Sequence, residues 1–135
     1  EANAAMPEHA VNILNSELGS LNGKNIAVLG ISYRGGVKES AFSGVFPAVA
    51  ALKANGANVF VNDPMYTDEE IKKYGFEPYK IGSSVDGVVL QADHKEYADL
   101  TSAKLPGIKT LLDGRGITKS NNWLDIKYHV IGKAL

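Results

Sequence analysis

The sequence predicts one α/β domain with three layers, in which helices cover both faces of a mainly parallel sheet of about five or six strands. Short, continuously apolar segments recur along the chain, which is typical of strands buried on both faces of a parallel sheet. Segments with helical spacing alternate with them, which is the order of right-handed βαβ units. The length of 135 residues and the apolar fraction of 44% fit a single packed domain.

An amphipathic helix is expected before the first strand, over residues 6–18. Pro7 suits a first helical turn, and Gly19 suits the end of the helix. The apolar stripe of this helix is either core or a surface for a partner, and we expect half of an interface between two copies. The stripe comprises Met6, Ala10, Ile13, Leu14 and Leu18.

The remaining elements alternate between strands and helices, as a Rossmann-like three-layer αβα domain requires. A second helix is expected over residues 42–52 and a third between Thr67 and Gly75, where Thr67 and Glu70 have capping-box spacing. A further helix begins between Asp93 and Glu96. The predicted strands are residues 24–30, 58–62, 87–91, 109–113 and 128–132, with a short edge strand within 76–80.

Composition excludes several classes of function. A net charge of −1 provides no clustered basic surface for nucleic acid. No apolar run reaches the roughly 18 residues of a membrane span, so a cytoplasmic protein is expected. The chain has no cysteine, and therefore neither a disulfide framework nor a thiol nucleophile.

Two glycine-flanked arginines follow predicted strands, where ligands of open α/β sheets bind. Arg34 lies in the loop of residues 30–40, and Arg115 lies in the Asp-Gly-Arg-Gly segment of residues 113–116. Each arginine forms either a surface salt bridge or a clamp on its loop, or it binds a phosphate or carboxylate group. We favour the anion site, because glycine lets the backbone approach a ligand while a planar cation reaches it.

The first loop approaches two phosphate-binding motifs and matches neither. Ser32 stands where the dinucleotide fingerprint needs its second glycine. Gly36 and Val37 replace the Lys-Ser/Thr pair of a P-loop, so an NTPase is not expected. Asp63 could hold a ribose in an NAD site, but we prefer to interpret Asp63-Pro64 as a turn that ends the second strand.

The histidines and the tryptophan are assigned structural roles. His9, His94 and His129 are scattered and have no metal-ligand spacing. His94 is expected to cap or flank a helix. Trp123 is expected to anchor packing and not to stack on a ligand.

In these loops the sequence resembles the C-terminal, UDP-binding domain of the UDP-glucose/GDP-mannose dehydrogenase family, and most closely its UDP-N-acetyl-D-mannosamine dehydrogenase branch. The resemblance covers nearly the whole chain, and the long first loop followed by Asp-Gly-Arg-Gly is its most specific part. It rests on residues 3–18, 28–40, 63–64, 92–94 and 113–116.

The resemblance implies a fragment of an NAD-dependent oxidoreductase that oxidises the C6 alcohol of a UDP-hexose or UDP-N-acetylhexosamine to a uronate for polysaccharide or cell-envelope precursors. NAD and the catalytic cysteine would belong to a preceding domain, with no metal, so this chain is expected to be inactive alone. Residues 1–21 would end a central dimerisation helix that makes a homodimer, and residues 22–135 would form the nucleotide-sugar-binding domain.

The resemblance also implies site residues. Tyr33, Arg34 and Arg115 look like substrate-binding residues, and Lys38 looks like a residue that reaches the cofactor; no catalytic residue is expected in this chain. Arg34 stands where many members have lysine, and Lys38 where many have arginine. The first loop is also about two residues shorter than in the UDP-glucose enzymes. The alternative is a stand-alone nucleotide- or anion-binding module, or an interaction module, without catalytic activity.

Overall fold

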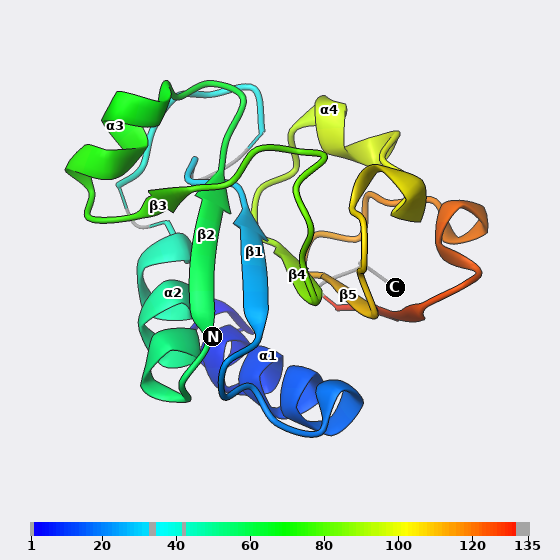
Figure 1. The fold of residues 1–135 in the computed structure, drawn as a ribbon. Helices are drawn as coiled ribbons and strands as arrows, with labels where there is room; N and C mark the ends of the chain where they lie inside the picture. The colour runs from blue at the N-terminus through cyan, green and yellow to red at the C-terminus, as the bar shows by residue number, and fades with distance from the viewer. Residues whose placement is uncertain (1, 33–34, 42, 132–135) are drawn as a thin grey trace.

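The structure, a computed structural model, describes residues 2–32, 35–41 and 43–131, with side chains from residue 7 onward. It confirms the predicted α/β domain (Figure 1). Six strands form one sheet in the order β3-β2-β1-β4-β5-β6, and every neighbouring pair is parallel. The strands are β1 (Asn25–Leu29), β2 (Asn58–Asn62), β3 (Glu77–Pro78), β4 (Gly87–Leu90), β5 (Thr110–Asp113) and β6 (Lys127–Val130).

The helices differ from the predicted ones mainly at their first residues. The first helix starts one turn earlier than predicted, because alanines with high helix propensity precede Pro7, which therefore lies inside the helix. The second starts at Val45, later than predicted, and Phe42 lies outside the described residues. The helices are α1 (Ala2–Leu18), α2 (Val45–Ala54), α3 (Asp68–Lys73) and α4 (Lys95–Ala98), with 3-10 turns η1 (Ser102–Lys104) and η2 (Ser120–Trp123).

Alternation along the central strands sends apolar side chains into two cores, one on each face of the sheet. On β1, Ile26 and Val28 face the core beneath α1 and α2, whereas Ala27 and Leu29 face the opposite core. Trp123, 1% exposed, packs in this second core, so its assignment as a packing anchor is confirmed. Both faces of β1 and β4 are buried, which explains their continuous apolar sequences.

The stripe on α1 packs mainly within this chain. Ala10 and Leu14 are 1% and 0% exposed, and Ile13 and Leu18 pack partly buried against the same core. The Glu17 carboxylate contacts the ring of His129 at 2.5 Å, which joins α1 to β6. For Ala10 and Leu14 the core interpretation is confirmed, because α2 and the sheet cover them, whereas an interface with a second copy through this helix stays a prediction.

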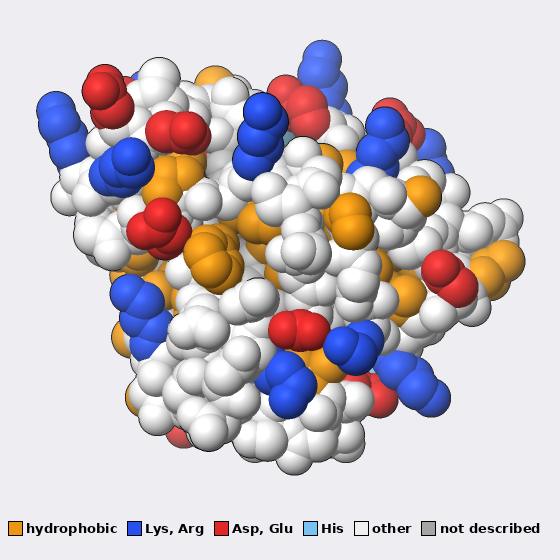
Figure 2. All heavy atoms as spheres, in the orientation of Figure 1, with side chains coloured by type: hydrophobic (Ala, Val, Ile, Leu, Met, Phe, Trp, Pro, Cys, Tyr) orange, Lys and Arg blue, Asp and Glu red, His pale blue; other side chains and the backbone are white. Residues whose placement is uncertain are grey.

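The strand order places a topological switch point between β1 and β4. From these adjacent strands the chain continues to opposite sides of the sheet, which opens a crevice beyond their carboxyl ends. Acidic and basic side chains are interspersed over the face shown in Figure 2. Within the described residues, no helix combines the length and apolar character needed to cross a membrane.

Candidate functional site

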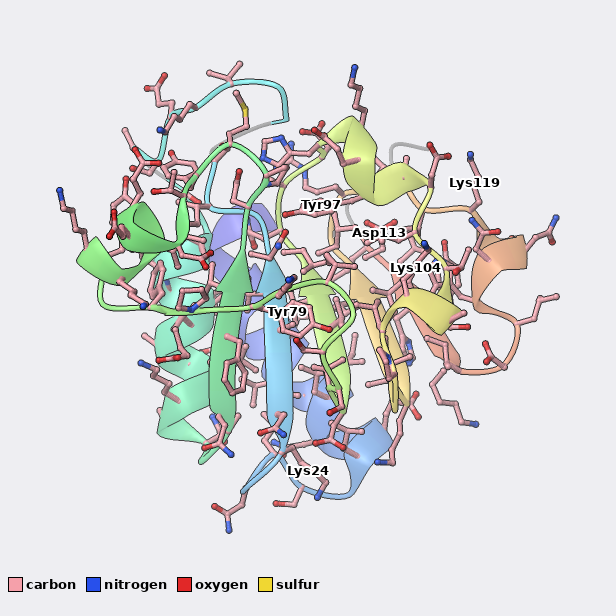
Figure 3. All side chains as sticks on the ribbon, turned by 45° about the horizontal axis from the view of Figure 1, so that its top comes forward. Lys24, Tyr79, Tyr97, Lys104, Asp113 and Lys119 are labelled. Atoms are coloured by element: carbon pink, nitrogen blue, oxygen red, sulfur yellow. The ribbon has the colours of Figure 1, made fainter. Side chains whose placement is uncertain are left out.

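The candidate site lies at the carboxyl edge of the sheet, where the segments after β1, β2, β4 and β5 converge. Asp113 and Tyr97 lie toward this edge, and Lys24 lies at the opposite end of the sheet (Figure 3). Gly30 and Gly35 allow the first loop to lie against the segment after β4. A Cβ on Gly30 would lie 2.4 Å from the Ala92 side chain, and one on Gly35 would lie 2.1 Å from the Asp93 carbonyl oxygen.

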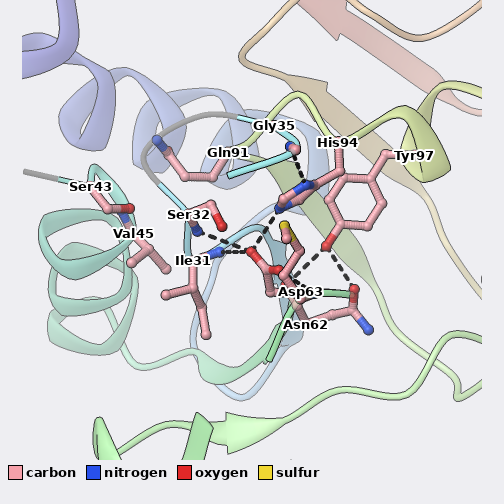
Figure 4. Close-up of polar contacts among 12 residues, drawn as sticks. Ile31, Ser32, Gly35, Ser43, Val45, Asn62, Asp63, Gln91, His94 and Tyr97 are labelled. Carbon is pink, nitrogen blue, oxygen red and sulfur yellow. Dashed lines mark hydrogen bonds and ion pairs between the residues drawn. The ribbon is translucent and has the colours of Figure 1, made fainter. Parts of the chain in front are cut away.

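Asp63 is a buried hydrogen-bond acceptor at the centre of this edge, 3% exposed. Its Oδ2 accepts from the backbone N–H groups of Ile31 at 2.7 Å and Ser32 at 3.0 Å (Figure 4). Its Oδ1 accepts from the N–H of Met65 at 2.8 Å, which forms the turn predicted for Asp63-Pro64. The turn is confirmed, and the same carboxylate also fixes the start of the first loop.

His94 completes this buried group and is 1% exposed. It flanks α4 at the N-cap position, as predicted, but its side chain makes no capping bond. Nδ1 lies 3.1 Å from the backbone nitrogen of Gly36, and Nε2 lies 2.9 Å from Oδ2 of Asp63. An N–H can only donate, so Nδ1 accepts and Nε2 carries the proton given to Asp63.

Tyr97 closes the second core beneath His94. Its hydroxyl donates to the carbonyl oxygen of Asn62 at 3.0 Å and to Oδ1 of the same residue at 2.7 Å. Burial, and then the carboxylates of Asp63 and Glu96, raise the pKa of Tyr97 far above its usual value, so the phenol stays protonated.

Asp113 organises the Asp-Gly-Arg-Gly loop and is fully buried. Its Oδ1 accepts from the N–H groups of Arg115 at 2.9 Å and Gly116 at 2.8 Å. Its Oδ2 accepts from the N–H and the hydroxyl of Thr118. These contacts fix the backbone from which the Arg115 side chain projects.

Arg115 lies beside the segment that holds the first loop. Its Nη1 lies 3.5 Å from the carbonyl oxygen of Gln91, and its Nη2 lies 3.7 Å from Oδ2 of Asp93. The other oxygen of Asp93 accepts from the N–H of Gly35. One carboxylate therefore contacts both loops that the sequence singled out, and it partners Arg115 while leaving 31% of that side chain exposed.

Lys38 lies against α3. Its Nζ forms an ion pair with Oε2 of Glu70 at 2.7 Å and lies 5.1 Å from the centre of the Tyr66 ring. The hydrogen bond from Lys38, and then the backbone N–H of Thr67, lower the pKa of Glu70. Lys38, Tyr66 and Glu70 line a hollow of about 460 Å³ together with Ser40, Lys73 and Tyr74.

The two predicted site residues that the structure describes lie in different surroundings. Arg115 lies at the carboxyl edge and shares Asp93 with the first loop, whereas Lys38 pairs with α3. Tyr33 and Arg34 lie outside the described residues. A hollow of about 410 Å³ opens beside the first loop and is lined by Gly35, Gly36, Met65, Asp93, His94, Lys95 and Glu96.

Sequence reasoning missed the roles of Asp63, Asp93 and His94 in holding the first loop. Each follows a predicted strand of a parallel sheet, which places it at the ligand-binding edge, and that position was the available signal. Their partners are 31, 32 or 58 residues away, so no local motif reveals the contacts.

The site does not fit an orthodox NAD site. The acidic residue that would hold a ribose, Asp63, is buried, and its oxygens already accept bonds from Ile31, Ser32, Met65 and His94. In the described part of the chain, no three acidic or histidine side chains are grouped so as to hold a metal ion.

Comparison with known proteins gives concordant matches. Residues 27–120 match the model of the UDP-glucose/GDP-mannose dehydrogenase family, UDP binding domain. A UDP-N-acetyl-D-mannosamine dehydrogenase from Methanococcus vannielii is 27% identical over 131 residues, which cover 91% of this chain and 30% of the relative. A UDP-glucose 6-dehydrogenase from Rickettsia bellii is 28% identical over 127 residues, covering 85% of this chain and 29% of the relative.

Solved structures share the fold. A UDP-glucose dehydrogenase from the hyperthermophilic archaeon Pyrobaculum islandicum superposes with a TM-score of 0.78 at 24% identity, covering 93% of this chain and 29% of that one. The UDP-N-acetyl-mannosamine dehydrogenase Cap5O from Staphylococcus aureus superposes with a TM-score of 0.74 at 21% identity, covering 94% and 31%. The chain spans about three tenths of the length of the curated relatives it matches.

Proposed function

We propose a function from one premise: the chain belongs to the UDP-glucose/GDP-mannose dehydrogenase family, as its UDP binding domain. The resemblance predicted from the two loops is thereby confirmed. In this function the carboxyl edge of the sheet holds the nucleotide of a UDP-sugar. Family membership favours this function over a stand-alone interaction module.

The whole protein, in this proposal, is a cytoplasmic NAD-dependent UDP-sugar 6-dehydrogenase. It oxidises the C6 alcohol of a UDP-hexose or UDP-N-acetylhexosamine to a uronate for polysaccharide or cell-envelope precursors. NAD supplies the hydride acceptor, and it and the catalytic cysteine are assigned to a part of the protein beyond this chain. Residues 1–21 would belong to a central dimerisation helix, and residues 22–135 to the nucleotide-sugar-binding domain of a homodimer.

The observation that supports substrate binding is the placement of Arg115. Asp113 fixes its backbone, and 31% of the side chain stays exposed at the carboxyl edge. The distance of 3.7 Å between Nη2 of Arg115 and Oδ2 of Asp93 is long for a charged hydrogen bond, so this contact is a loose ion pair at the exposed edge of the site. A guanidinium binds phosphate through two parallel N–H bonds, which a lysine does not reproduce.

In this proposal the four site residues of the chain have different roles. Arg115 would neutralise and orient the diphosphate, and Tyr33 with Arg34 would contact the substrate from the first loop. Lys38 would reach the cofactor only by leaving Glu70.

Replacing Arg115 tests the proposal. Loss of a charge-assisted hydrogen bond of roughly 1.5–3 kcal/mol predicts that Arg115→Ala weakens UDP binding about 10- to 150-fold. Arg115→Lys should restore only part of the affinity, because a point charge replaces a planar fork. Isothermal titration with UDP and a melting curve on the same samples measure both properties.

Lys119→Ala is the matched control, because it removes one positive charge from an exposed side chain that pairs with Asp99 near the same loop. It should leave UDP affinity within about twofold. If Arg115→Ala lowers only the melting temperature and keeps UDP affinity, Arg115 merely braces its loop, and the proposed role is wrong.

A further inference from the structure

The first half of the first loop is held at two places by side chains that follow other strands. Asp63 accepts from Ile31 and Ser32 at its start, and the segment after β4 accepts further along, through Asp93 from Gly35 and His94 from Gly36. The two residues between these anchors, Tyr33 and Arg34, are the ones assigned to the substrate. The described backbone on either side of these two residues is therefore held by groups that need not touch a ligand themselves.

The side chain of His94 joins the two places by one hydrogen bond on each side of its ring. Its Nε2 donates to Asp63 at 2.9 Å, and its Nδ1 accepts from Gly36 at 3.1 Å (Figure 4). Gly36 has a φ of +76°, a conformation that side-chain-bearing residues rarely adopt. The imidazole ring thus acts as a rigid spacer that sets the distance between Asp63, at the start of the loop, and Gly36 further along it.

We propose that His94 is a positioning residue for nucleotide binding: its ring holds Gly36 at a fixed distance from Asp63, and this fixes the described backbone of the first loop, at residues 31, 32, 35 and 36, beside the proposed substrate site. The inference rests on the proposed UDP-binding function and deepens it. His94 is 1% exposed and acts on the ligand only through the loop. A purely structural His94 would support the core without altering affinity.

Two substitutions separate the two bonds of the ring. His94→Asn keeps an amide oxygen near the position of Nδ1, so it can accept from Gly36 but does not reach Asp63. His94→Gln reaches Asp63 with its NH₂ group but offers Gly36 no acceptor. Each variant loses one buried hydrogen bond, so both should lower the melting temperature by several degrees, and His94→Asn by more, because its lost bond is to a charged carboxylate.

UDP affinity should separate the variants. His94→Gln should weaken UDP binding about 3- to 10-fold, the equivalent of one lost neutral hydrogen bond, whereas His94→Asn should stay within about twofold of the unmodified chain. Tyr97→Phe is the matched control, because Tyr97 is buried beside the His94 ring but bonds Asn62 and not the loop. It should lower stability and leave UDP affinity unchanged.

The measurement is titration of this chain and its variants with UDP, together with the ring-nitrogen shifts of His94 and the amide exchange rate of Gly36 by NMR. Faster Gly36 exchange in His94→Gln alone, with weaker UDP binding, supports the proposal. Equal UDP affinity in the two variants overturns the positioning role only. Absence of UDP binding by the unmodified chain overturns the proposed function, and the positioning role with it.

Discussion

Asp113 and Asp63 stand at equivalent places, at the carboxyl ends of β5 and β2, and both are buried, at 0% and 3% exposed. Asp113 accepts from Arg115, Gly116 and Thr118, which are two to five residues further along the chain. Asp63 accepts from Ile31 and Ser32, which are 32 and 31 residues away, and from His94 on a third segment.

This difference means that the two halves of the candidate site are assembled differently. The Asp113 loop can form once its own short segment turns, because its acceptor and donors are neighbours in sequence. The first loop acquires its shape only after β1, β2 and β4 pair, because its acceptors come from the other two strands. A substitution of Asp63 should therefore disturb residues that follow several strands, whereas a substitution of Asp113 should disturb only its own loop.

The largest effect is expected from Asp63→Asn. The amide NH₂ cannot accept, so at least one of the donors now served by the carboxylate loses its partner in a buried place, at a cost of about 3 kcal/mol in the free energy of unfolding. Urea denaturation measures this loss. NMR exchange should show Ile31 and Ser32 deprotected together with Gly36, which shares the His94 link.

Asp68→Asn, an exposed carboxylate in the first turn of α3, serves as the control and should change stability by less than about 0.5 kcal/mol. Full protection of Ile31 and Ser32 in Asp63→Asn would contradict the account of Asp63 as the anchor of the first loop.

A smaller and more local effect is expected from Asp113→Asn. The N–H groups it releases belong to half-buried loop residues, so water can replace the lost acceptor, and the cost should be about 1–2 kcal/mol. Exchange should accelerate at Arg115, Gly116 and Thr118 while Ile31 and Ser32 stay protected. Deprotection of the first loop in this variant would show that the two halves are not independent.

The sequence predicted the elements whose signals are local. Continuous apolar runs located β1, β4 and β5 within a residue, and the Thr67–Glu70 capping box located α3, where both reciprocal bonds form. The Asp-Gly-Arg-Gly segment was recognised for the same reason, since its glycines and its acceptor lie within four residues.

The sequence did not reveal features that depend on tertiary packing. Leu14 has the same periodicity whether its helix covers this sheet or a partner. Only the placement of α2 and the sheet shows that Leu14 is buried within this chain. His94 occupies a helix N-cap position, but its side chain turns inward because Asp63 offers it a hydrogen-bond acceptor there and the Gly36 N–H offers it a donor. Such contacts become visible only when distant strands are placed side by side.

The smallest effect is expected from a third carboxylate, Glu70, which contacts the first loop from outside. It joins Lys38 across 32 residues, as Asp63 joins Ile31, but both side chains of the pair are largely solvated, at 44% and 39% exposed. Glu70→Gln can keep the capping bond to Thr67 through its amide oxygen, and it removes the charge and the oxygen that accepts from Lys38, because its NH₂ group cannot accept. The melting temperature at neutral pH and moderate salt should therefore fall by no more than about 1 °C.

The pH dependence gives the sign of this contribution. The folded chain lowers the pKa of Glu70 below 4.5, first through Lys38 and then through Thr67, so the unfolded chain binds the proton more readily. The stabilisation is present above that value and is lost as the pH falls through the folded pKa, and the melting curves of Glu70→Gln and the unmodified chain should converge in acid. A difference of several degrees that persists in high salt would show that an exposed long-range carboxylate anchors the first loop as strongly as a buried one, and burial would then not explain the importance of Asp63.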